Sequence, residues 1–233
     1  MSLIRSILFA LAQTVFTLLY ALLSPVIFLF GQHTRHRLLS GFAPGMLWLL
    51  RNICNIRMEV RGLENIPRAS CVVLSKHQSA WETLALQQVL PLHVWVVKRE
   101  LLWIPFFGWL LALSSPIALN RGKGKEAMRE LLAKGKEKLE RGFSIVIFPE
   151  GTRIPYGEKG RYKIGGALLA KHTGVVVLPV AHNAGKFWGR NAFIKQPGVV
   201  QMVIGAPIDT ADLTAEEINR RVEDWIEGEM ATL

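Results

Sequence analysis

The chain has 233 residues, half of them hydrophobic, and a formal net charge of +10 at pH 7. The length fits one α/β domain with an appendage, and the positive charge favours anionic partners such as lipid headgroups, nucleic acid or phosphorylated substrates. The two cysteines, Cys54 and Cys71, have apolar neighbours and belong to no CxxC motif or Cys/His cluster. The composition therefore supports neither a disulfide framework nor a zinc site.

Residues 1–56 are predicted to form membrane-associated helices. No charged residue occurs from Ile7 to Phe30, which is longer than the roughly 20 residues that span a bilayer. Pro25 is expected to kink or end the first helix. The run is too long for a cleaved signal peptide, and no A-x-A site follows it. Leu38 to Ile56 is a shorter apolar stretch, interrupted by glycine and proline, which suits an interfacial helix.

These two segments are predicted to form a helical hairpin that dips into one leaflet, although one full span with a surface helix fits the sequence equally. Arg5 precedes the first apolar run, whereas Arg35, Arg37 and Arg51 follow it. The larger basic cluster lies after the run, so the positive-inside rule predicts that the remainder of the chain faces the cytoplasm.

Residues 57–233 are predicted to form an α/β domain. Seven runs, several of them continuous in Val and Ile, predict strands: Arg57–Arg61, Cys71–Ser75, Val94–Val97, Pro116–Leu119, Ser144–Phe148, Val175–Val180 and Val199–Ile204. The clearest helical pattern is Lys123–Glu140, whose basic face fits lipid headgroups and plain solvation equally. A last helix begins at a capping box from Thr214 to Glu217. The alternation predicts a largely parallel central sheet flanked by helices.

A histidine and a glutamate, His77 and Glu82, follow the second predicted strand, just before a helical pattern that begins at Thr83. In open α/β sheets, ligands bind at the carboxyl ends of the strands. Ser79 and Glu82 have the spacing of a capping box, which places the carboxylate near His77 as the partner of a general base. Taken alone, the pair equally fits a helix cap beside a structural histidine.

A polar turn, Pro149 to Arg153, follows the fifth predicted strand. Pro149 stops strand pairing, and Gly151 permits a backbone geometry that other residues avoid. The turn is expected to place Glu150 and Arg153 at the same edge of the sheet as His77, where an arginine suits bidentate phosphate recognition. A salt-bridged loop is the plain alternative.

Basic residues also flank a strongly apolar segment, residues 101–113. Lys98 precedes the segment and Arg121 follows it, after the fourth predicted strand, while Arg161 and Lys163 add positive charge further on. A substrate with an anionic head and an apolar tail would need this combination. A core helix with charged ends is the alternative.

Together these motifs resemble the glycerolipid acyltransferase family, and more specifically bacterial 1-acyl-sn-glycerol-3-phosphate acyltransferases. The matching motifs, in the family's order over about residues 55 to 205, are His77-x4-Glu82, Arg121 after an apolar strand, Phe148-Pro149-Glu150-Gly151-Thr152-Arg153 and Leu178-Pro179-Val180. The family usually has aspartate where Glu82 stands. The same carboxylate on a side chain one methylene longer is expected to preserve the dyad.

The resemblance implies transfer of a fatty acyl group from acyl-CoA or acyl-acyl-carrier protein to the sn-2 hydroxyl of lysophosphatidate, which gives phosphatidate. His77 would be the general base and Glu82 would fix its tautomer, whereas no covalent role is expected for Ser79. Glu150 would orient Arg153 or a substrate hydroxyl. The implied substrate-binding residues are Arg121, Glu150, Gly151, Thr152, Arg153 and Lys163. No metal or cofactor is implied.

The resemblance also implies an enzyme of the cytoplasmic (inner) membrane that meets membrane lipids, a lysophospholipid acceptor and an acyl thioester donor. Two alternatives stay open: the same chemistry on another acceptor, such as a lyso-ornithine lipid or another lysophospholipid, and a non-catalytic basic lipid-binding protein. No nucleic-acid reader module is recognisable, so nucleic acid is not an expected partner. His93, His172 and His182 lack a carboxylate at motif spacing and are not expected at the site.

Overall fold

The computed structural model describes all 233 residues and contains one seven-stranded sheet in the order β1-β7-β6-β2-β5-β3-β4. The strands are β1 (Ile56–Arg61), β2 (Val72–Ser75), β3 (His93–Lys98), β4 (Ile117–Leu119), β5 (Ser144–Ile147), β6 (Val177–His182) and β7 (Gly198–Ile204). Neighbouring strands are parallel except β6 and β7, which are antiparallel. The predicted α/β fold is confirmed, and every predicted strand is present with ends shifted by at most two residues.

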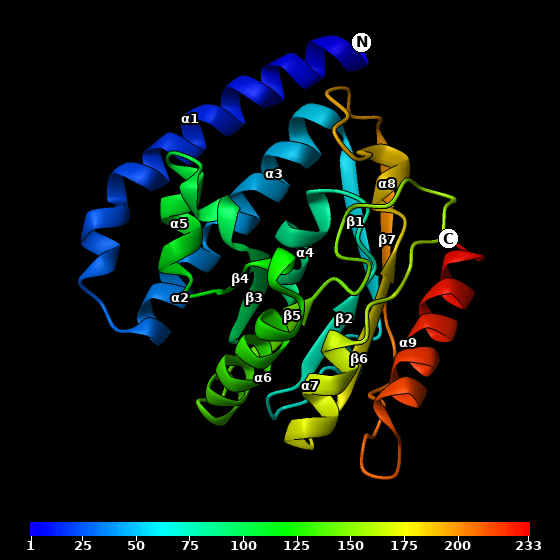
Figure 1. Cartoon of the computed structure of the whole chain (residues 1–233). Helices are drawn as coiled ribbons and strands as arrows, with labels where there is room; N and C mark the ends of the chain where they lie inside the picture. The colour runs from blue at the N-terminus through cyan, green and yellow to red at the C-terminus, as the bar shows by residue number, and fades with distance from the viewer.

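Helices cover both faces of this sheet (Figure 1). They are α1 (Ser2–Phe28), α2 (Gln32–Ser40), α3 (Phe42–Cys54), α4 (Trp81–Val89), α5 (Phe107–Leu113), α6 (Gly124–Glu140), α7 (Gly165–Thr173), α8 (Ala184–Phe187) and α9 (Ala215–Met230), with short 3-10 turns at Leu63–Asn65, Arg99–Trp103 and Arg121–Lys123. The predicted helix before β5 and the capping box of the last helix, between Thr214 and Glu217, are both present.

The short strand β2 lies at the centre of the molecule, between two hydrophobic cores. Val72 and Leu74 pack in the core formed with α6, α7 and α9, whereas Val73 packs in the core formed with α1, α3 and α4. Successive side chains of a strand point to opposite faces, so a strand covered on both faces is apolar throughout. This arrangement explains the continuous Val/Ile runs of the sequence.

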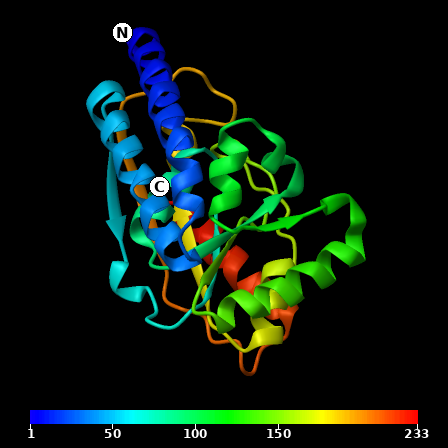
Figure 2. The ribbon, with the colours of Figure 1, turned by 90° about the vertical axis from the view of Figure 1, so that its left-hand side faces the viewer.

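The N-terminal helices form a hairpin in which α1 packs against α3, with α2 between them in the chain (Figure 2). The helix α1 has an 18-residue window with a mean hydropathy of 2.0 and is long and apolar enough to cross a membrane. It continues past Pro25 to Phe28, so the proline does not end it at once. Pro25 has no N–H to donate to the carbonyl four residues earlier, so the helix lacks one hydrogen bond there and still continues for three residues.

The first turns of α1 dock on a loop near the end of the chain, residues 188–197. Phe9, which has no exposed surface, meets Trp188 edge-on at 5.7 Å between ring centroids. The hydroxyl of Ser6 accepts the main-chain N–H of Lys195 at 2.9 Å, and the ammonium of Lys195 lies 4.8 Å from the Trp188 ring centroid. The boundary between the N-terminal helices (residues 1–56) and the α/β domain (residues 57–233) remains a prediction. The contacts of Phe9 and Ser6 with the loop join these two parts.

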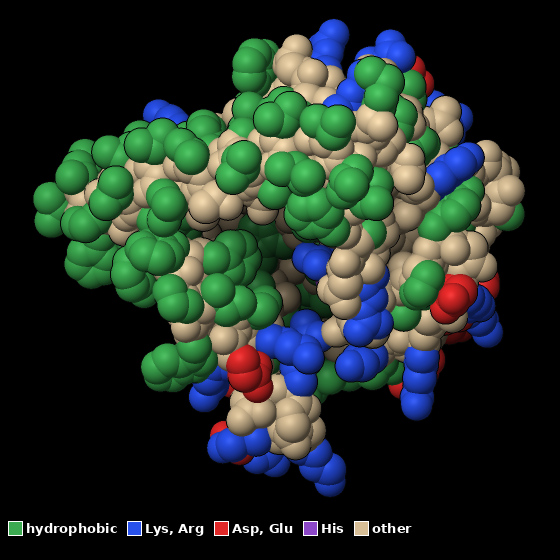
Figure 3. All heavy atoms as spheres, turned by 90° about the horizontal axis from the view of Figure 1, so that it is seen from above, with side chains coloured by type: hydrophobic (Ala, Val, Ile, Leu, Met, Phe, Trp, Pro, Cys, Tyr) green, Lys and Arg blue, Asp and Glu red, His purple; other side chains and the backbone are tan.

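Exposed hydrophobic side chains gather over α1 and the neighbouring α5 segment, beside a hollow whose rim carries lysine and arginine (Figure 3). On α1 they include Leu11 (62% exposed) and Leu22 (74% exposed), and before α5 they include Trp103 (81% exposed). Large apolar side chains gathered on one face mark a candidate interaction surface.

Candidate active site

The carboxyl ends of five parallel strands, β6, β2, β5, β3 and β4, meet at one edge of the sheet. His77 follows β2, the turn Phe148–Arg153 follows β5, and Arg121 follows β4. The structure therefore brings together the three motifs that the sequence places after separate strands, as expected for an open α/β sheet.

His77 and Glu82 form a hydrogen-bonded pair, with 2.7 Å between the imidazole Nδ1 and the carboxylate Oε1. Glu82 has no exposed surface, and its carboxylate also accepts the main-chain N–H groups of Gln78 and Ser79 at 3.0 and 2.9 Å. The glutamate lies in the first turn of α4, where the helix dipole favours a negative charge. Because Nδ1–H donates to Glu82, Nε2 is left as the basic nitrogen of His77.

The predicted capping box at the start of α4 forms only in part. Glu82 accepts the N–H of Ser79, but the Ser79 hydroxyl accepts the N–H of Trp81 at 3.1 Å instead of that of Glu82. The helix begins at Trp81, two residues earlier than the pattern from Thr83 indicated. The hydroxyl of Ser79 is buried and bound to the main chain, which leaves it no access to a substrate.

A second histidine, His182 at the end of β6, lies behind the pair, with Nε2 3.9 Å from Oε2 of Glu82. Its Nε2–H donates to the carbonyl of Lys76 at 2.9 Å, and its Nδ1 accepts the N–H of Ala184 at 3.2 Å. Burial lowers the pKa of His182, although the charge of Glu82 and the hydrogen bond to the carbonyl of Lys76 oppose the shift. No local pattern predicts this contact, because His182 is brought to Glu82 only by the pairing of β2 with β6.

The ionised form of Glu82 is favoured despite its burial. Burial alone would raise the pKa of this carboxyl, but His182, His77 and the N–H of Ser79 together hold the pKa below its ordinary value. Glu82 is therefore a carboxylate at neutral pH and can stabilise a positive charge that develops on His77.

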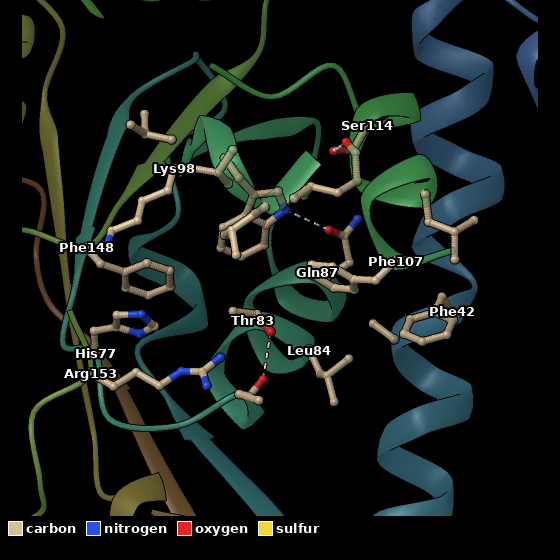
Figure 4. A pocket seen from close by; sticks show the side chains of 18 of the residues that line it. Phe42, His77, Thr83, Leu84, Gln87, Lys98, Phe107, Ser114, Phe148 and Arg153 are labelled. Atoms are coloured by element: carbon tan, nitrogen blue, oxygen red, sulfur yellow. Dashed lines mark hydrogen bonds between the residues drawn. The ribbon is translucent and has the colours of Figure 1, made fainter. Parts of the chain in front are cut away.

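The ring of His77 is fixed from a second side by Phe148 at the end of β5. The two rings stack with 3.9 Å between their centroids and an angle of 13° between their planes. The side chain of His77 is 15% exposed, and Figure 4 shows it at the wall of a cavity. The stacking and the bond to Glu82 together leave the imidazole one orientation, facing that cavity.

The cavity has a volume of about 520 Å³ and two chemically different ends. Its polar end is lined by His77, Arg121, Gly151, Thr152, Arg153, Arg190 and Asn191. Its other walls are mostly apolar and come from α1, α3, α4 and α5: Tyr20, Phe42, Leu84, Phe107, Leu110 and Leu111. Figure 4 shows Arg153 beside His77, with Leu84 and Phe42 further along the cavity. This shape suits a ligand with an anionic head and an apolar tail.

Three guanidinium groups line the polar end, and none of them forms an ion pair with a carboxylate. Arg121 donates from Nη1 to the carbonyl of Gly151, and Arg190 donates from Nη1 to the carbonyl of Arg153 at 3.2 Å. Like charges gathered without a counter-ion favour an anionic ligand. Arg190 was not predicted from the sequence, because no motif surrounds it in the loop after α8.

Gly151 lets the turn after β5 approach these cations. Its φ is +69°, a region that favours glycine, and a Cβ added there would lie 2.7 Å from Nζ of Lys163 and 3.4 Å from Nη1 of Arg121. Lys163 lies beside this turn but does not line the cavity, and its role in substrate binding stays a prediction. Thr152 and Arg153 line the cavity as the sequence indicated.

Glu150 has a different set of partners from the expected one. Its Oε2 accepts the main-chain N–H of His77 at 2.9 Å, and its Oε1 lies 2.8 Å from Nζ of Lys76, with both side chains buried. Glu150 does not line the cavity and is not paired with Arg153. The buried ammonium of Lys76 requires a counter-ion, which explains why this carboxylate turns inward.

Metal-ligating side chains do not cluster in the protein: no group of three or more His, Cys, Asp or Glu could hold a metal ion. Cys54 and Cys71 are buried free thiols. Besides His77 and the three arginines, the side chains of Lys98 and His36 also line the cavity.

Comparison with known proteins places the chain among the acyltransferases. The family model described as "Acyltransferase" matches residues 57–183. A 1-acyl-sn-glycerol-3-phosphate acyltransferase of Pseudomonas aeruginosa is 47% identical over 190 residues, which cover 80% of this chain and 74% of the relative. A human relative, 1-acyl-sn-glycerol-3-phosphate acyltransferase beta, is 29% identical over 182 residues, which cover 76% of this chain and 66% of the relative.

The crystal structure of the 1-acyl-sn-glycerophosphate acyltransferase PlsC from Thermotoga maritima has the same fold. Its TM-score is 0.83 at 24% sequence identity, with 99% of this chain and 95% of that chain covered. The family match covers the motifs that place His77, Glu82, Arg121 and Arg153 around the cavity. The chain belongs to the acyltransferase family.

Proposed function

We propose that the protein is a 1-acyl-sn-glycerol-3-phosphate acyltransferase, which transfers a fatty acyl group from a thioester to the sn-2 hydroxyl of lysophosphatidate. The observation that carries the proposal is the His77–Glu82 pair, 2.7 Å apart, at a cavity where unpaired arginines adjoin apolar walls. The similarity to the Pseudomonas enzyme of that name supports the same acceptor.

The acceptor's phosphate binds at the arginine end of the cavity. Arg121, Arg153 and Arg190 present planar guanidinium groups, which form charge-assisted and bidentate hydrogen bonds with phosphate oxygens. Binding the phosphate there holds the glycerol backbone near His77, while the acyl chain runs toward the apolar walls. Proximity and orientation of this kind lower the barrier by removing the entropy of bringing the reactants together.

In the chemical step, Nε2 of His77 accepts the proton of the sn-2 hydroxyl as its oxygen attacks the thioester carbonyl carbon. Glu82 stabilises the imidazolium that results. The tetrahedral intermediate then collapses, the C–S bond breaks, and the proton on Nε2 passes to the departing thiolate. The products are phosphatidate and a free thiol, and general base catalysis contributes roughly 10²–10⁴-fold to the rate.

The donor is acyl-CoA or acyl-acyl-carrier protein, and the enzyme acts at the cytoplasmic face of the inner membrane. Both donors are water-soluble thioesters, whereas lysophosphatidate lies in a bilayer. The exposed apolar side chains of α1 and the basic rim beside the hollow fit an enzyme that binds a membrane surface by both hydrophobic and electrostatic attraction (Figure 3).

The test is an assay of the purified protein in detergent with labelled lysophosphatidate and acyl-CoA or acyl-acyl-carrier protein. The parent should make labelled phosphatidate, and His77→Ala should abolish it. His172→Ala is the matched control, because His172 is an exposed histidine that does not line the cavity. Equal turnover by the parent and His77→Ala would refute the assigned base.

An acceptor panel tests the substrate class. Lysophosphatidate carries a phosphomonoester, whereas lysophosphatidylcholine and a lyso-ornithine lipid do not. We expect a preference for lysophosphatidate that is lost in Arg153→Ala. Efficient acylation of a lyso-ornithine lipid with no turnover of lysophosphatidate would contradict the proposed acceptor and retain only the acyl transfer.

A further inference from the structure

A cluster of four side chains lies behind the catalytic loop, outside the cavity. The ammonium Nζ of Lys76 lies 2.8 Å from Oε1 of Glu150 and 2.8 Å from Oε1 of Glu227. The hydroxyl of Tyr162 donates to the same oxygen of Glu227 at 2.8 Å. The Lys76 side chain is 1% exposed, and none of the four residues lines the cavity. The cluster therefore acts on a substrate only through other groups.

The cluster connects the last helix of the chain to His77. Glu227 belongs to α9 and lies 151 residues from Lys76 in the sequence. Lys76 directly precedes His77, and Oε2 of Glu150 accepts the main-chain N–H of His77 at 2.9 Å. A continuous set of contacts therefore leads from Glu227, through Lys76 and Glu150, to the peptide that carries the catalytic imidazole.

Both carboxylates are needed to satisfy the buried ammonium. Lys76 has three N–H donors on a side chain that is 1% exposed, so the ion pair with Glu150 alone would leave donors without an acceptor. Glu227 and the carbonyl of Glu158, 3.3 Å away, provide the remaining acceptors. Without Glu227, the ammonium is expected to move toward solvent or toward Glu150 and to disturb the carboxylate that holds His77.

The role of the cluster is better explained by the atomic positions that it fixes than by a contribution to the free energy of unfolding. A buried ion pair is often no more stabilising than apolar side chains of the same volume, whereas its directional contacts fix the atoms that they join. Burial raises the pKa of Glu150 and Lys76 opposes the shift, so the position of Lys76 also influences the charge of Glu150. A displaced Lys76 would weaken the acceptor that holds the N–H of His77.

We propose that Glu227 is a positioning residue for acyl transfer, which holds the main chain of His77 through Lys76 and Glu150 so that the imidazole keeps its bond to Glu82. Tyr162 orients Glu227 within this arrangement. The inference rests on the proposed role of His77 as the general base. The family model ends at residue 183, so α9 lies outside the matched region.

The test compares Glu227→Ala, Glu227→Gln and Tyr162→Phe with Glu223→Gln in the full-length protein in detergent. Glu223 lies one turn earlier on α9 and pairs with Lys159 at 2.8 Å on the surface, so it controls for the loss of a carboxylate from this helix. The measurements are kcat and KM for lysophosphatidate, the midpoint of thermal unfolding, and ¹⁵N NMR signals of the histidines. His77→Ala assigns the His77 signals.

We expect Glu227→Ala to lower kcat about tenfold, because a small misplacement of a reacting group slows the chemical step strongly. KM for lysophosphatidate should stay within about twofold, since the phosphate-binding arginines are untouched. Glu227→Gln retains an acceptor oxygen for Lys76 and should keep more activity than the alanine variant. The Nδ1–H signal of His77 should shift in Glu227→Ala and stay unchanged in Glu223→Gln.

Parent-like kcat and an unchanged His77 spectrum in folded Glu227→Ala would overturn the proposal. Equal losses of thermal stability and activity in Glu227→Ala and Glu223→Gln would also overturn it, because they would indicate a purely structural role. If Glu227→Ala fails to fold, kcat and the His77 spectrum of Glu227→Gln and Tyr162→Phe test the proposal instead. A parent that makes no phosphatidate would refute the proposed function, and the NMR comparison would still test the positioning of His77.

Discussion

The Nδ1 of His77 and the Oε1 of Glu82 lie 2.7 Å apart, a separation that this site reaches with the longer of the two acidic side chains. The same carboxylate accepts the main-chain N–H of Ser79 at 2.9 Å. An aspartate, one methylene shorter, cannot make both contacts unless the loop or the start of α4 moves. The length of the glutamate is therefore matched to the distance between His77 and the helix.

The Glu82 side chain can be tested by shortening it and by neutralising it. We expect Glu82→Asp to lower kcat about tenfold, because one of its two contacts is lost or stretched, and Glu82→Gln to lower kcat about 10³-fold, because an amide does not stabilise the imidazolium. Steady-state kinetics with lysophosphatidate would measure both. Glu64→Gln, an exposed glutamate, is the control. A fully active Glu82→Asp would show that the extra methylene is not required.

The pH dependence of stability should report the ionised Glu82. Its pKa in the folded protein lies below the ordinary value of 4.5, so the folded state binds its proton less readily than the unfolded state does. The carboxylate therefore stabilises the fold above about pH 4.5, and this contribution is lost as pH falls through the lowered pKa of the folded state.

Thermal unfolding of the parent and of Glu82→Gln, measured from pH 3 to pH 7, checks this sign. The midpoint for the parent should fall more steeply below about pH 4.5 than that of the variant, which lacks the titrating group. Parallel curves for the two proteins would mean that Glu82 is not held ionised in the fold.

Arg190 should contribute to acceptor binding although it belongs to no motif. We expect Arg190→Ala to raise KM for lysophosphatidate about tenfold, because a hydrogen bond to a charged group contributes about 1.5–3 kcal/mol. The control is Arg161→Ala, an exposed arginine that does not line the cavity. An unchanged KM in Arg190→Ala would place the phosphate nearer to Arg121 and Arg153 alone.

Alanine substitutions at two glycines with positive φ can distinguish the effect of backbone strain from that of crowding by neighbouring side chains. Gly151 has a φ of +69° and crowded surroundings, whereas Gly157 has a φ of +83° and nothing within 4 Å of an added Cβ. Both alanine variants should lose about 1 kcal/mol of stability from the left-handed backbone. Only Gly151→Ala should also raise KM for lysophosphatidate, because its Cβ would crowd Nζ of Lys163, 2.7 Å away, beside the phosphate-binding arginines. Denaturant titrations and kinetics would distinguish the two effects.

The exposed and buried faces of α1 should respond differently to mutation. Leu22→Asp changes a side chain that is 74% exposed, so it should weaken binding to lipid vesicles and leave the thermal midpoint unchanged. Phe9→Ala removes a ring that has no exposed surface and should destabilise the fold by about 3–5 kcal/mol. Vesicle co-sedimentation and thermal unfolding measure the two outcomes. Undiminished vesicle binding by Leu22→Asp would contradict a membrane role for this part of α1.

The sequence predicted the parts of the fold that depend on local patterns. Continuous Val/Ile runs identified central strands such as β2 and β5, because strands covered on both faces must be apolar throughout, whereas the edge strand β1 alternates polar and apolar residues. The His77–Glu82 contact was predictable since both residues lie within one loop and one helical turn. Strand order, and with it the antiparallel β6–β7 pair, depends on packing between distant segments, which no local pattern encodes.

Site residues that come from distant segments of the chain could not be predicted from local sequence patterns. His182, Arg190 and Glu227 reach the site from the end of β6, the loop after α8 and the last helix, and none has a sequence neighbour that marks its role. The family resemblance implied that Glu150 orients Arg153 or a substrate hydroxyl, but its carboxylate contacts Lys76 and the main-chain N–H of His77 instead. The buried Lys76, whose need for a counter-ion decides the direction of Glu150, is visible only once β2 and β5 are paired.

The docking of α1 on the loop at residues 188–197 has a consequence for biosynthesis. Translation releases α1 from the ribosome long before Trp188 and Lys195, its contacts in the finished molecule, have been made. During that interval α1 can pack only against earlier parts of the chain such as α3, and the edge-on contact of Phe9 with Trp188 is missing. The order of synthesis therefore makes the packing of α1 on α3 possible first and its docking on the loop possible second. Chains truncated before Trp188 should be released incompletely folded, with α1 still undocked.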